Sequence, residues 1–164
     1  MHILLATDAD WIVDEVIAAL GDDDVHFTVC REGRVVAAEV KQQVPDLAIL
    51  DLQIGSMGAM AVTMALRLDE SAGAVDHVKV LILLDRAADI HLARRSGAEG
   101  WLIKPLDALR LRRAADALAA GGRYDEGLPP DATAVEPMVP LADADDAEIE
   151  DQVESTEEEP ATAG

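Results

Sequence analysis

The chain has 164 residues, of which 50% are apolar and only 2% aromatic, and its formal net charge is −20. This length suits one ordinary domain with an extension, and the charge argues against electrostatic binding to nucleic acid or to an anionic membrane surface. The single cysteine, Cys30, excludes an intrachain disulfide and a paired-cysteine metal site, and we expect it to be buried.

Apolar runs alternate with helical periodicities through the first 120 residues. The run at 47–50 is unbroken and follows Pro45, which is typical of a strand buried on both faces of a parallel sheet. Asp10 and Asp107 are expected to cap helices at their N-termini, and Gly97 to end one. The expected strands are 3–6, 25–30, 47–50, 78–84 and 101–103, and the expected helices are 12–20, 35–40, 60–68, 87–96 and 108–120.

Five alternations of strand and helix predict an α/β fold. The sheet should be parallel, five-stranded and doubly wound in the order 2-1-3-4-5, with helices on both faces. The more alternating segment at 25–30 suits a strand at the sheet edge.

The character of the chain changes after Gly122. Residues 125–164 contain 14 acidic residues and no basic one, so residues 1–124 carry only −6 of the net charge. The segment is rich in proline and lacks a sustained apolar face. We therefore expect a domain at 1–122 and a disordered acidic tail at 123–164.

The N-terminus lacks the basic region and cleavage site of a signal peptide, and no apolar run is long enough to span a membrane. These features lead us to expect a cytoplasmic protein.

Polar residues follow the expected strands at the carboxyl edge of the sheet, where open α/β proteins bind ligands. Asp8 and Asp51 can face each other there, and two carboxylates with backbone oxygens and water suit Mg²⁺. Lys104 can neutralise a bound phosphoryl oxygen or form an ion pair with Asp51. Asp85 can either supply polarity near Leu84 or be a solvated loop acid, and we expect the second. Pro105 can adopt a cis peptide bond in a tight turn, which would aim Lys104 back over the strand ends.

Three motifs together resemble the receiver domain of bacterial two-component response regulators, over roughly residues 1–120. They are His-Ile-Leu-Leu-Ala-Thr-Asp at 2–8, Pro-Asp-Leu-Ala-Ile-Leu-Asp-Leu at 45–52 and Ser-Gly-Ala-Glu-Gly-Trp-Leu-Ile-Lys-Pro at 96–105.

The resemblance assigns roles to particular positions. It implies that Asp51 accepts a phosphoryl group from a histidine kinase or phosphotransfer protein. Asp8, Asp51 and the backbone carbonyl of Gln53 would hold Mg²⁺, and Lys104 would contact the phosphoryl group. The positions of Leu84 and Trp101 would move together as a switch.

Two departures from the family pattern weaken the phosphorylated state. Thr7 replaces the first acid of the metal-binding pair. Leu84 stands where a hydroxyl side chain should donate to a phosphoryl oxygen, which a leucine cannot do. A ligand shifts a two-state equilibrium only through differential interaction with the two states. Phosphorylation is therefore expected to be weak or absent here.

The main functional hypothesis is a stand-alone atypical receiver that acts through protein contacts and is not an enzyme. No DNA-binding or catalytic domain is expected to follow it. The resemblance implies a target surface at about 87–120, and a homodimer stays open.

One alternative is a conventional receiver phosphorylated by a histidine kinase. A remote one is a phosphatase of the haloacid dehalogenase type, to whose Asp-x-Asp motif Thr-Asp-Ala-Asp at 7–10 is similar. A dinucleotide site is disfavoured because the first strand-to-helix turn has no glycine.

Overall fold

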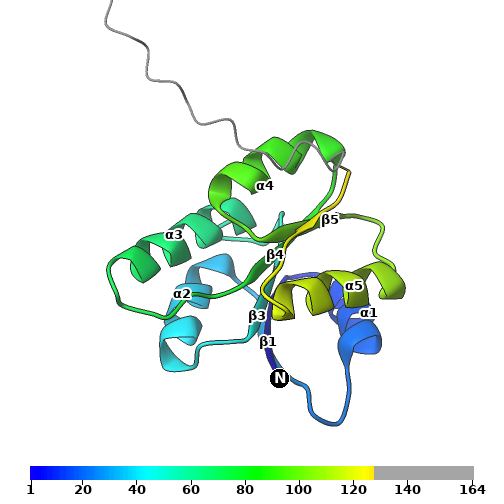
Figure 1. Cartoon of the computed structure of the whole chain (residues 1–164), viewed down its shortest axis with the longest axis horizontal. Coiled ribbons are helices and arrows are strands. Elements are labelled where there is room, and N and C mark those ends of the chain that lie inside the picture. Colours follow the sequence, from blue (N-terminus) through cyan, green and yellow to red (C-terminus); the bar gives the residue numbers. More distant parts are fainter. Residues whose placement is uncertain (128–164) are drawn as a thin grey trace, which may run out of the picture. The chain divides into compact units, whose positions relative to one another are not determined.

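The computed structural model describes residues 1–127, which form a parallel sheet between two layers of helices (Figure 1). The expected acidic tail at 123–164 lies outside the described residues except for its first part, 123–127. Among residues 1–127, no helix is long and apolar enough to cross a membrane.

Strands and helices alternate as the sequence predicts. The strands are β1 (His2–Ala6), β2 (His26–Cys30), β3 (Leu47–Asp51), β4 (Val80–Leu84), β5 (Gly100–Ile103) and β6 (Tyr124–Asp125). The helices are α1 (Asp10–Leu20), α2 (Gly33–Gln42), α3 (Ala59–Ser71), the short 3₁₀ helix η1 (Ala87–Asp89), α4 (Ile90–Ser96) and α5 (Ala108–Ala119).

All strand pairs are parallel, and the order in the sheet is β2-β1-β3-β4-β5-β6. The predicted order of the first five strands is confirmed, including the edge position of β2. The sixth strand was not predicted. It follows α5 through Gly121 and Gly122 and pairs with β5, with Gly100 opposite Tyr124.

The central strands are buried on both faces because their side chains alternate between two apolar clusters. In β1, Leu4 and Ala6 belong to the cluster under α2, α3 and α4, whereas Ile3 and Leu5 belong to the cluster under α1 and α5. Figure 1 shows these two groups of helices on opposite faces of the sheet. Cys30 is buried, as expected.

Capping explains where some helices begin and end. Asp107 caps α5 by accepting a hydrogen bond from the Arg110 N–H, and Gly97 ends α4 with a φ of 86°, so both expectations are confirmed. The expectation for Asp10 is wrong. Ala9 precedes α1 and Asp10 is its first residue, with its carboxylate paired to Arg31 at 2.7 Å.

Several predicted boundaries also shift. β4 begins at Val80 rather than at 78, because the Val78 N–H donates to Glu70 and the Val78 carbonyl accepts from Arg67. The helix expected at 87–96 is divided into η1 and α4.

Candidate functional site

Asp51 ends β3 and is only 2% exposed. Its Oδ1 accepts a hydrogen bond from Lys104 Nζ at 2.6 Å, and its Oδ2 accepts one from Thr7 Oγ1 at 2.9 Å. The Gln53 N–H also points to Oδ1 at the longer distance of 3.4 Å. The ends of β1, β3 and β5 therefore converge as the sequence predicts, and both carboxylate oxygens bind side chains of the chain itself.

Lys104 reaches Asp51 from the end of β5. Its backbone N–H donates to the Leu84 carbonyl at 2.8 Å, which fixes the end of the strand, and the peptide bond to Pro105 is cis. The Nζ atom also donates to Asp85 Oδ1 at 2.9 Å. Burial acts against the charged form of Lys104, but the hydrogen bonds to Asp51 and Asp85 outweigh it and raise the pKa of the lysine.

Asp85 is part of this cluster, and the expectation that it is a solvated loop acid is wrong. Its side chain is 33% exposed and forms an ion pair with Lys104. Its second oxygen, Oδ2, is buried and has no hydrogen-bond partner within residues 1–127. One ammonium group thus lies between two carboxylates. The sequence places Asp85 at this edge of the sheet, but its ion pair with Lys104 was not predicted because Asp85 follows β4 in a loop without a motif.

Thr7 replaces an acid with a neutral hydroxyl. The residue is fully buried, and its Oγ1 donates to Asp51 while accepting from the Ala9 N–H at 3.2 Å. A carboxylate at this position would repel Asp51 unless a cation lay between them. The hydroxyl instead donates a hydrogen bond to Asp51, so both oxygens of that carboxylate have partners from the chain itself.

The donor set fits a magnesium ion poorly. Asp8 is exposed, and its Oδ2 lies 3.5 Å from the position a Cβ atom would take on Gly55, so it faces the loop after β3. Within residues 1–127, no three His, Cys, Asp or Glu side chains lie close enough together to hold a metal ion. Both Asp51 oxygens already accept hydrogen bonds from Lys104 and Thr7, and the predicted set of Asp8, Asp51 and the Gln53 carbonyl holds only two carboxylates.

An exposed tryptophan lies beside the site and was not among the predicted residues. Lys104 Nζ is 5.8 Å from the centroid of the Trp11 ring, within the range of a cation–π contact. Trp11 is 49% exposed and lies in the first turn of α1. Its indole can therefore report on what happens at Lys104.

Leu84 and Trp101, at the two predicted switch positions, are fully buried in the apolar cluster under α2, α3 and α4. Leu84 is the last residue of β4 and lies opposite Ile103. Trp101 donates its indole N–H to the Glu126 carbonyl at 2.8 Å. Neither side chain makes a polar contact with Asp51 or Lys104 among the described residues.

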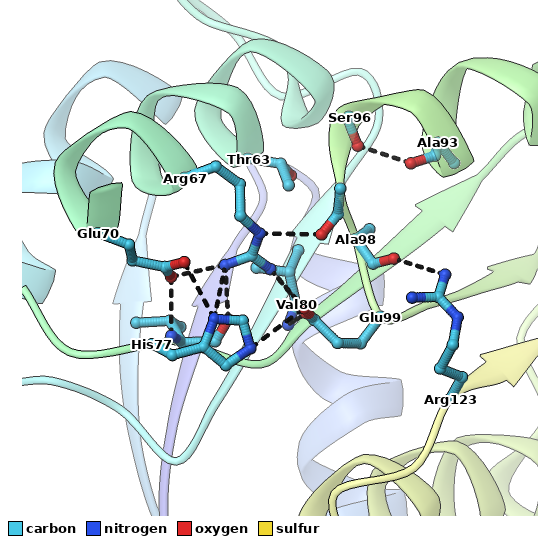
Figure 2. Close-up of polar contacts among 12 residues, drawn as sticks. Thr63, Arg67, Glu70, His77, Val80, Ala93, Ser96, Ala98, Glu99 and Arg123 are labelled. Atoms are coloured by element: carbon cyan, nitrogen blue, oxygen red, sulfur yellow. Dashed lines mark hydrogen bonds and ion pairs between the residues drawn. The ribbon is translucent and has the colours of Figure 1, made fainter. Parts of the chain in front are cut away.

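A second polar cluster, also missed by sequence reasoning, surrounds Arg67 near the start of β4 (Figure 2). Arg67 donates to Glu70 at 2.6 Å and to both carboxylate oxygens of Glu99 at 2.8 and 2.7 Å. His77 lies between the same two acids, 3.0 Å from Glu70 and 3.2 Å from Glu99. The spacing of Arg67 and Glu70 on one helix could have indicated this pair, whereas Glu99 comes from a distant loop.

This cluster is closed rather than open to a ligand. The Arg67 guanidinium also donates to the Gly97 and Val78 carbonyls, so its donors face protein acceptors. Burial disfavours the charged form of Glu70, but hydrogen bonds from the Val78 N–H and His77 help to lower the pKa of its carboxyl group. The cluster ties α3 to the segments that flank β4 and β5, and we assign it a structural role.

Comparison with known proteins agrees with this geometry. The family model described as "Response regulator receiver domain" matches residues 3–116. A search of curated protein sequences found no significant match.

Solved structures share the fold at low sequence identity. The receiver domain of NtrX from Brucella abortus is 21% identical, with a TM-score of 0.62 over 72% of this chain and 98% of that one. A LuxR-family two-component response regulator from Aurantimonas is 21% identical, with a TM-score of 0.66 over 79% and 90%. The chemotaxis response regulator CheY4 of Vibrio cholerae is 21% identical, with a TM-score of 0.62 over 70% and 95%. Because the family model covers well over half of the sequence and the fold agrees, the chain belongs to the response regulator receiver domain family.

Proposed function

We propose that this protein is an atypical receiver domain whose output is made by protein contacts and does not depend on phosphorylation of Asp51. Receiver domains are signalling modules of two-component systems, they typically bind Mg²⁺ in an acidic pocket, and they interact with histidine kinases or phosphotransfer proteins. Under this proposal the protein still binds partners as a receiver domain does, but phosphorylation does not control that binding. The phosphatase alternative has no support beyond a short motif, and family membership speaks against it.

The observation that carries the proposal is the double contact of Asp51 with Thr7 and Lys104. A phosphodonor must approach a carboxylate that is 2% exposed and hydrogen-bonded through both oxygens. Each contact is a hydrogen bond to a charged group, worth about 1.5 to 3 kcal/mol. Phosphorylation would break at least one of them, and Leu84 offers no hydroxyl in exchange.

The proposed contact surface is the exposed part of residues 87–120. On α4 and α5 it presents Leu92 and Leu109, which are 53% and 57% exposed, together with the exposed arginines Arg95 and Arg113. Apolar side chains flanked by arginines are typical of protein interfaces. A histidine kinase, a phosphotransfer protein or a second copy of the chain are the partner classes that the family suggests.

Intact mass spectrometry after incubation with phosphoramidate and Mg²⁺ tests the proposal. We expect no phosphoryl adduct on the wild-type chain. The double variant Thr7→Asp/Leu84→Thr, which restores the two missing groups, serves as the matched positive control and is expected to gain one adduct. An adduct on the wild type that Asp51→Asn abolishes would instead support the conventional receiver.

A further inference from the structure

The segment after α5, residues 123–127, covers the outer edge of β5, a strand within the proposed contact surface at 87–120. It runs beside β5 (Figure 1, yellow), and the Tyr124 N–H donates to the Glu99 carbonyl at 3.1 Å. A strand edge left open presents unpaired N–H and C=O groups, which readily accept another strand. Here the chain itself supplies that strand.

The edge contains a binding site for a carboxylate, and Glu126 occupies it. One Glu126 oxygen accepts a hydrogen bond from the Ile103 N–H, and the Arg110 guanidinium donates to both oxygens at 2.7 and 2.6 Å. Arg110 is itself held in place because it donates to the Ile103 carbonyl at 2.7 Å. A planar guanidinium beside a strand N–H is well suited to recognise a carboxylate through two oxygens.

Two further contacts along the same groove join side-chain N–H groups to backbone carbonyls. Trp101 donates its indole N–H to the Glu126 carbonyl, and Arg123 donates to the Ala98 carbonyl at 3.0 Å (Figure 2). A Cβ atom on Gly100 would lie 2.9 Å from the Tyr124 carbonyl oxygen, so only glycine allows this close approach. The groove therefore fits an extended segment with an acid at the Glu126 position.

The segment is attached in a way that allows it to leave. Its residues are half-buried or exposed, and none belongs to the buried core. Tyr124 packs against the apolar cluster under α1 and α5, whereas Arg123 and Glu126 are attached by polar contacts that water can replace. The segment follows Gly121 and Gly122, at which the chain can bend away from α5. Local opening of such elements costs less free energy than global unfolding.

We propose that the β5 edge with Arg110 is a binding groove for an extended acidic segment of a partner protein, and that residues 123–127 occupy this groove as a competitor within the same chain. This mode is strand addition, in which main-chain hydrogen bonds supply affinity and one side-chain pocket supplies specificity. The inference rests on the proposed function, since it names the kind of partner that an output made of contacts would use.

The test uses the full chain and a synthetic peptide that copies residues 122–127. All variants carry Trp11→Phe, so that Trp101 is the only tryptophan. Glu126→Ala weakens the internal competitor, and Tyr124→Pro weakens it through a different contact, the N–H donated to Glu99. Asp116→Ala, which removes an exposed carboxylate from α5, is the matched control.

We expect Glu126→Ala to shift Trp101 emission to the red and to strengthen peptide binding by about tenfold or more, because the variant removes the hydrogen bonds that the carboxylate accepts from Ile103 and Arg110. The control should behave as the background chain does. Binding should be lost when the peptide has Gln at the position of Glu126. It should also be lost when Arg110→Ala is added to the Glu126→Ala chain.

Two results would overturn the proposal. If neither Glu126→Ala nor Tyr124→Pro changes Trp101 emission, the segment does not detach. If emission shifts but no peptide binds, the edge is not a recognition groove. Failure of the proposed function would give a different result. Phosphoramidate would then change peptide binding by the Trp11→Phe chain, and adding Asp51→Asn to that chain would abolish the change.

Discussion

Lys104 Nζ lies 2.6 Å from Asp51 Oδ1, and this ion pair closes the pocket that the receiver fold builds at the ends of its strands. The lysine side chain is 13% exposed and the aspartate side chain 3%, so solvent screens the pair little. Together with the Thr7 hydroxyl, the pair satisfies Asp51 without a phosphoryl group or a cation.

Removing the lysine should be costly because it leaves a buried charge unpaired. For Lys104→Met we expect the free energy of unfolding to fall by about 3 kcal/mol, the typical effect of deleting one partner of a buried ion pair. Urea unfolding measures this. Adding Asp51→Asn should recover most of the loss, because the charge that lost its partner is then gone. A double variant no more stable than Lys104→Met would contradict the ion-pair account.

Restoring an acid at position 7 should make stability depend on magnesium. Thr7→Asp removes a hydrogen bond to a charged group and places a like charge beside Asp51, so we expect a loss of about 2 kcal/mol without the cation. Saturating Mg²⁺ should reverse this loss in the variant and leave the wild type unchanged. Thr7→Ser keeps the hydroxyl and is the matched control. An equal stabilisation of wild type and Thr7→Asp by Mg²⁺ would refute the prediction.

The lowered pKa of Glu70 predicts a dependence of stability on acid pH. A carboxyl group whose pKa is lower in the folded chain than its ordinary value of 4.5 contributes stability above that value. The contribution is lost as the pH falls from about 4.5 through the folded pKa, because the unfolded chain binds the proton first. Urea unfolding at several pH values should therefore show a steeper acid loss for the wild type than for Glu70→Gln. Parallel pH profiles would show that the carboxylate contributes nothing.

Cys30 should be chemically inert in the folded chain. It is 3% exposed, and burial, aided by the charge of Glu39, raises its pKa from 9.0 to about 11. The neutral thiol is favoured by folding, so this contribution to stability is present below about pH 9 and is lost as the pH rises toward 11. Reaction with a disulfide reagent at pH 8 should follow the rate of unfolding. Rapid labelling of the native chain would contradict the buried position.

The strand order was predictable because unbroken apolar runs such as 47–50 and 80–84 require burial on both faces. The meeting of Asp51 with Lys104 followed from parallel strands ending at one edge. The ion pairs of Lys104 with Asp85 and of Arg67 with Glu99 could not be predicted, because both acids lie in loops that have no periodic pattern. Strand β6 was missed because Tyr124-Asp125 has little apolar character, and hydrogen bonds from Trp101, Ile103 and Arg110 hold Glu126 against β5.

The central claim is that the output of this protein does not depend on phosphorylation of Asp51, so a phosphoryl group at Asp51 should leave the β5 edge unchanged. The two tryptophans report on these places separately, because Trp11 lies beside Lys104 and the Trp101 indole N–H binds the Glu126 carbonyl. The most direct measurement is the NMR spectrum of the two indole N–H groups with Mg²⁺ and beryllium fluoride, a mimic of the phosphoryl group. We predict that the Trp101 resonance stays in place at every concentration, whether or not the Trp11 resonance moves. A saturable shift of the Trp101 resonance that Asp51→Asn abolishes would show a working phosphorylation switch and contradict this account.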